Sequence, residues 1–87
     1  MNPDDEPALF YAGITCMELL DFEGAIKYLN QVTGSGQNIF SRPALWYLSL
    51  AYIKSDNNDM AVSCLHQLTE GDDNYAKSSK KILKKIN

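Results

Sequence analysis

The chain has 87 residues, of which 45% are hydrophobic, and this composition predicts one small folded domain spanning residues 1–87 rather than a disordered segment. The net charge of −3 excludes the overall basic character typical of nucleic-acid-binding domains, and no apolar run is long enough to span a membrane. The two cysteines lie far apart and indicate neither a disulfide framework nor a zinc site, which favours a reducing compartment such as the cytoplasm, and the acidic N-terminus does not resemble a signal peptide.

The first half of the chain predicts two helices, because its apolar residues recur with helical spacing and not in sustained strict alternation. We expect Asp4 or Asp5 to cap the first helix and Asp21 to end it. The second helix is predicted over about 22–32, and the glycines of 34–36 stop it because glycine readily adopts the left-handed conformation found at helix ends. The predicted apolar stripes of these two helices are Leu9, Ala12, Gly13, Cys16 and Leu20, and Ala25, Ile26, Leu29 and Val32.

The second half of the chain predicts three more helices. The third opens with Ser41 as its cap and ends in the polar segment 55–58. The fourth is predicted over about 59–69, and Asp72 or Asp73 is expected to cap the fifth. The predicted apolar stripes of the third and fourth helices are Leu45, Leu48, Ser49 and Tyr52, and Ala61, Val62, Leu65 and Leu68.

The last helix is predicted to divide its residues between an apolar face and a lysine face. Residues 75–87 carry five lysines and no acid, a local charge of +5, whereas residues 1–41 carry six acids and one lysine, a local charge of −5. We expect the lysines to form the polar outer surface of a terminal helix, and phosphate contacts are the alternative that we do not favour. The apolar face is predicted to contain Tyr75, Ser79, Ile82 and Ile86, with Ala76 and Leu83 beside them.

A shift of 36 residues matches the first pair of helices to the second, since it places Ala25 on Ala61. A sustained match at one offset indicates an internal repeat rather than chance amphipathicity. The same shift pairs Leu9 with Leu45, Phe10 with Trp46, Tyr11 with Tyr47, Ala12 with Leu48, Gly13 with Ser49, Cys16 with Tyr52, Leu29 with Leu65 and Val32 with Leu68.

These motifs resemble the tetratricopeptide repeat, whose period is about 34 residues and whose pattern is W-x2-L-G-x2-Y followed by A-x3-F. Leucine replaces the tryptophan of the pattern, the usual closing proline is absent, and the first linker is about two residues longer than the period allows. The segment 44–52 resembles the bacterial repeats that end such arrays. The pattern positions are Leu9, Ala12, Gly13, Cys16, Ala25 and Leu29 in the first unit, and Leu45, Leu48, Ser49, Tyr52, Ala61 and Leu65 in the second.

The resemblance implies an all-α fold of about five helices that form a right-handed superhelix. It places a first repeat over 6–41, a second over 42–73 and a capping helix over 74–87. The physical expectation is that helices approach closely at the small residues Gly13, Ser49, Ala25 and Ala61, where a larger side chain would cost about 1–3 kcal/mol.

In this family, the first helix of each unit lines a concave groove that holds a peptide, so the resemblance implies a non-catalytic protein-binding module. The matching positions here are apolar, which predicts an apolar or amphipathic segment of a protein or peptide partner. Family members that grip acidic chaperone tails use a Lys, Asn and Arg clamp, and these positions hold none of those residues. The groove residues are predicted to be Phe10, Ile14, Met17, Trp46, Leu50 and Ile53.

Two other functions remain open at this point. The groove can be filled by another copy of the chain, as in a homo-oligomer, or by repeats of a longer array of which this chain forms the end, because arrays below three repeats are usually marginal. Nucleic-acid binding through the lysine helix is a more remote alternative.

The residues with catalytic or metal-binding chemistry are few, and their spacing predicts no catalytic, cofactor or metal site. Cys64 and His66 are two apart on a predicted helix and therefore point away from each other. The acidic turn at 56–59 lacks the glycine and glutamate that a calcium loop needs, and no glycine-rich phosphate loop is present. We therefore expect a protein that is not an enzyme.

Overall fold

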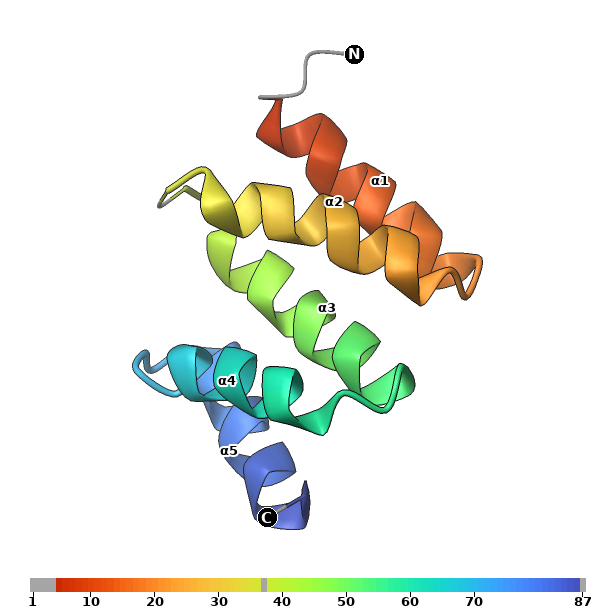
Figure 1. Cartoon of the computed structure of the whole chain (residues 1–87). Coiled ribbons are helices and arrows are strands. Elements are labelled where there is room, and N and C mark those ends of the chain that lie inside the picture. The colour runs from red at the N-terminus through yellow and green to blue at the C-terminus, as the bar shows by residue number, and fades with distance from the viewer. Residues whose placement is uncertain (1–4, 37, 87) are drawn as a thin grey trace.

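The computed structural model describes residues 5–36 and 38–86, and all of the regular structure in them is helical. The five helices are α1 (Glu6–Glu18), α2 (Phe22–Gly34), α3 (Ser41–Lys54), α4 (Asn58–Leu68) and α5 (Asn74–Ile86), and Figure 1 shows them in order along the molecule. The all-α prediction of five helices is confirmed for these residues.

Each helix packs against the next one along the chain. The helices α1 and α2 form one hairpin, α3 and α4 form another, and α2 joins the two hairpins by packing against α3. The last helix, α5, lies on α4 and touches α3 (Figure 1). The molecule is therefore elongated, with principal dimensions of 39 × 26 × 18 Å.

The turns inside the two hairpins have the same backbone structure at positions 36 residues apart. Leu20 and Asp56 both adopt the left-handed conformation, with φ values of 61° and 60°. In the next position, Asp21 donates its backbone N–H to the Cys16 carbonyl, and Asn57 donates its own to the Tyr52 carbonyl, both at 2.8 Å. The repeat found in the sequence is therefore also a repeat in local conformation.

Carboxylate and amide side chains cap four of the helices. Asp5 caps α1 by accepting from the Ala8 N–H at 3.2 Å, while Asp4 lies outside the described residues. Asp21 was predicted to end the first helix, but α1 stops at Glu18 and Asp21 instead caps α2. Asn57 caps α4 in the equivalent position, and Asp73 accepts from the Ala76 N–H at 2.9 Å at the start of α5.

The prediction that Ser41 caps the third helix is wrong. Ser41 is the first residue of α3, and Phe40 occupies the cap position without a side-chain hydrogen bond. The Ser41 hydroxyl instead donates to the Gly36 carbonyl at 3.1 Å and accepts from the Asn38 N–H at 3.0 Å. It therefore stabilises the connection between the two hairpins rather than the end of the helix.

Small residues allow the helices to approach, as the pattern predicts. A Cβ atom added to Gly13 would lie 2.7 Å from the Leu29 side chain, so α1 and α2 touch there. Ala25, Ser49 and Ala61 have no exposed surface. The hydrophobic core follows these contacts through both hairpins and contains Leu9, Leu29, Val32, Ala44, Leu48, Ala51 and Cys64 among others.

The last helix is buried along one narrow stripe formed by Ala76, Ser79 and Leu83. Ile82 and Ile86, which were predicted on the apolar face, are only half-buried. The side of α5 that packs is therefore rotated toward Ala76 and Leu83, which were predicted beside that face. The five lysines, at positions 77, 80, 81, 84 and 85, are all exposed. No helix within the described residues is both long and apolar enough to cross a membrane.

A candidate protein-binding face

The six predicted groove residues occupy equivalent positions on α1 and α3. Each trio follows i, i+4, i+7 spacing, which places its three side chains on one side of the helix. We call this surface the binding face, and its residues are Phe10, Ile14, Met17, Trp46, Leu50 and Ile53.

Burial differs among the residues of the binding face. Phe10 is only 9% exposed and belongs to the hydrophobic core. Ile14, Met17 and Ile53 are half-buried and pack against that core. Trp46 and Leu50 are also half-buried, so all three residues on α3 and two of the three on α1 are partly accessible.

An aromatic cluster explains the burial of Phe10. Its ring lies 5.1 Å from that of Phe40, which precedes α3, and 6.1 Å from that of Tyr47 (centroid distances). Tyr11 completes the cluster, with its ring 5.6 Å from Phe10. Such tilted and edge-on arrangements are the favourable ones for aromatic pairs. The anchor role predicted for Phe10 is therefore limited by its packing inside the molecule.

The last helix extends the binding face. The Trp46 ring lies 6.1 Å from the ring of Tyr75 at the start of α5, in a tilted arrangement. Tyr75 is half-buried. Sequence reasoning placed Tyr75 on the apolar side of the last helix but not beside Trp46, because that contact depends on how α5 returns against α3.

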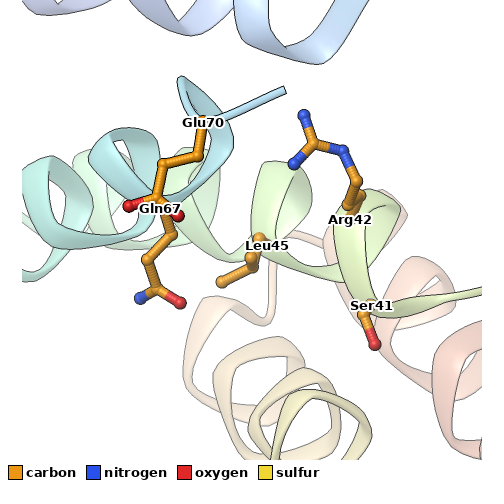
Figure 2. Close-up of a pocket in the computed structure, with 5 residues that line it drawn as sticks. All are labelled: Ser41, Arg42, Leu45, Gln67 and Glu70. Carbon is orange, nitrogen blue, oxygen red and sulfur yellow. The ribbon is translucent and has the colours of Figure 1, made fainter. Parts of the chain in front are cut away.

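A pocket of about 300 Å³ lies elsewhere, between the N-terminal end of α3 and the C-terminal end of α4. Figure 2 shows its lining side chains, which include Leu45, Gln67 and Glu70 and none of the binding face. Arg42 also lines it, but its guanidinium is already paired with Asp73 at 2.6 and 2.7 Å. Among the described residues that line the pocket, the only cation is therefore already paired with a carboxylate.

The cysteines are held as thiols rather than thiolates. Burial raises the pKa of Cys64 to about 11. Burial, and then the charge of Asp21, raises the pKa of Cys16 above its ordinary value. Both effects disfavour the nucleophilic form. No group of three or more metal-ligating side chains occurs among the described residues.

Comparisons of the chain with protein-family models, with curated proteins and with solved structures find no match. The structure itself shows a five-helix all-α domain whose helices pack sequentially as hairpins.

Proposed function

We propose that this chain is a tetratricopeptide-like superhelix that binds an apolar or amphipathic segment of a protein partner on the binding face. The observation that carries the proposal is the half-buried state of Trp46 and Leu50, two large apolar residues that folding leaves partly open to solvent. Partly exposed aromatic residues are frequent anchors of protein interfaces.

The repeat character supports this assignment. Positions 36 residues apart share their environments, since Ala25 and Ala61 are both fully buried, as are Leu29 and Leu65. The left-handed turn residues, Leu20 and Asp56, are equivalent too. The two hairpins therefore stack as related units, and stacked helical hairpins generate the extended surfaces that repeat proteins use for binding.

The module is proposed to be non-catalytic. The raised pKa values of Cys16 and Cys64 oppose thiolate chemistry. His66 is exposed and lies on the same helix as Cys64, two residues away, where side chains do not face each other.

This function is tested by measuring the affinity of the chain for peptides selected from an amphipathic library. Trp46→Ala and Leu50→Ala are each expected to weaken peptide affinity, with the tryptophan costing about 2 kcal/mol or more if it is a main anchor. Met60→Ala is the matched control, because Met60 is an exposed apolar residue on α4, outside the binding face. Circular dichroism of each variant checks that the helices remain. Equal losses for Met60→Ala and Trp46→Ala would contradict the proposal.

A further inference from the structure

The outer side of α1 has the character of a surface that another helix covers. In the second hairpin, α3 lies between α2 and α4, and Ala44 and Ala51 have no exposed surface. The positions 36 residues earlier, on α1, are Ala8, which is half-buried, and Thr15, which is exposed. Tyr11 is 62% exposed between them. We call Ala8, Tyr11, Thr15 and Glu18 the outer face of α1, and its only aromatic contacts in the described part of the chain are those of the Tyr11 ring with Phe10 and Phe40.

The far side of α5 is open as well, but its chemistry is different. The α3 helix is buried on two sides, whereas α5 is buried only along Ala76, Ser79 and Leu83. The rest of its circumference is dominated by the lysine face, which consists of Lys77, Lys80, Lys81, Lys84 and Lys85. The only ion pair among the described residues involves Arg42 and Asp73, so none of these five lysines is paired with an acid of residues 5–36 or 38–86.

The first hairpin carries a net negative charge: residues 1–41 contain six acids and one lysine, while the other five acids lie at positions 56, 59, 70, 72 and 73. Asp5 and Glu6 lie at the start of α1, and Glu18 lies at its end. Glu23 is exposed at the start of the adjacent α2. The first hairpin therefore has a net negative charge and α5 a net positive one, with three acids at positions 70, 72 and 73 directly before α5.

We propose that copies of this chain associate head to tail, with the lysine face of α5 in one copy against the outer face of α1 in the next. An antiparallel pairing brings Lys84 and Lys85 to Asp5 at the start of α1, and brings Lys77 to Glu18. Lys77 and Lys85 are about 12 Å apart along the α5 axis, and Asp5 and Glu18 are about 20 Å apart along α1, a difference that flexible lysine side chains span. The same arrangement opposes the two helix dipoles favourably.

A second copy fits the lysine face better than a nucleic acid does. The first hairpin of the chain itself carries a net negative charge, whereas the lysine face contains neither arginine nor an exposed aromatic residue for base stacking. The contact joins two different surfaces, so each pair leaves one lysine face and one outer face free. Such head-to-tail contacts continue into larger assemblies unless the geometry closes a ring.

Light scattering across a dilution series at about 50 mM salt tests the association. The mass is expected to rise from the 9.8 kDa monomer past the dimer with concentration, and to return toward the monomer at about 500 mM salt, where charges are screened. A constant monomer at low salt would overturn the proposal. So would a monomer that binds a DNA or RNA duplex through the lysine face.

A charge exchange separates this contact from a general effect of charge. The double variant K80E/K84E and the single variant E18K should each stay monomeric, because each places like charges in the contact. In a mixture of the two variants, the unchanged lysine face of E18K can contact the unchanged outer face of K80E/K84E. Association should therefore return. Leu50→Ala should associate as the wild type does, whereas loss of association in that variant would place the contact on the binding face instead. If each charge variant associates on its own, without the other, the proposal is also overturned.

Discussion

Arg42 and Asp73, 31 residues apart in sequence, form a two-point ion pair in which Nε lies 2.6 Å from Oδ2 and Nη2 lies 2.7 Å from Oδ1. The same Nη2 donates to the Leu68 carbonyl at the end of α4, at 2.9 Å. Asp73 in turn accepts from the Ala76 N–H and so caps α5. One guanidinium therefore connects the start of α3, the end of α4 and the start of α5.

This ion pair should make stability depend on acid pH. The Arg42 hydrogen bond, followed by that of the Ala76 N–H, lowers the pKa of Asp73 to about 2 from an ordinary value of 3.8. A lowered folded-state pKa contributes stability that is present above about pH 4 and is lost as the pH falls toward about 2. Denaturant unfolding of the wild type and of Asp73→Asn between these pH values measures the effect.

The asparagine variant keeps a capping side chain but loses the charge, so its stability should fall less over this pH range than that of the wild type. Asp72→Asn is the matched control, because the exposed Asp72 acts on Arg42 through its charge alone, whereas Asp73 also hydrogen-bonds to it. If wild type and Asp73→Asn lose stability in parallel, the ion pair does not contribute.

Gly13 is expected to be intolerant of a side chain. A Cβ there would lie 2.7 Å from the Leu29 side chain in the contact between α1 and α2. Gly13→Ala should therefore lower the free energy of unfolding by about 1–3 kcal/mol, the usual cost of overpacking. Gly34→Ala has open space around the added atom and should change stability little. Equal effects of the two substitutions in chemical denaturation would rule out the close contact.

Two buried serines should respond oppositely to alanine. Ser79 has no exposed surface, and its hydroxyl has no hydrogen-bond partner among the described residues. Ser49 is equally buried, but its hydroxyl donates to the Trp46 carbonyl at 2.6 Å. We expect Ser79→Ala to raise the free energy of unfolding by about 1 kcal/mol and Ser49→Ala to lower it by a similar amount. Thermal unfolding of both variants decides this, and destabilisation by Ser79→Ala would show that its hydroxyl is satisfied.

The two thiols should differ in reactivity. Cys16 is partly exposed, whereas Cys64 is 5% exposed with its pKa raised to about 11 by burial. In the native protein near neutral pH, a thiol reagent should modify Cys16 well before Cys64. Single-cysteine variants, Cys64→Ala and Cys16→Ala, report the two rates separately, and the difference should vanish in denaturant. Faster modification of Cys64 would mean that the second hairpin opens readily.

Periodicity and the 36-residue shift predicted the helices and the small residues between them, because local spacing determines both. The placement of Leu20 on the apolar stripe of the first helix is wrong, because Leu20 lies beyond α1 in a left-handed turn and is 73% exposed. Neither Leu20 nor its counterpart Asp56 is the glycine that this conformation usually favours. Ser41 looked like a helix cap, but contacts with the preceding loop determined its role.

Long-range contacts were beyond sequence reasoning. The ion pair of Arg42 and Asp73 requires the path of the chain through two further helices. For the binding face, the register gave six equivalent positions but not their burial. Phe10 is enclosed because Phe40 and Tyr47 fold against it, and Trp46 has a neighbour in Tyr75 only because α5 touches α3.

The most direct test of the proposed function is an NMR titration of the isotope-labelled chain with a selected amphipathic peptide. We predict that the indole N–H of Trp46 and the backbone amides of Leu50 and Ile53 shift with a common affinity, while the amides around Met60 stay in place. Saturable shifts confined to α4 or to the lysine face, with Trp46 unmoved, would contradict binding at this face.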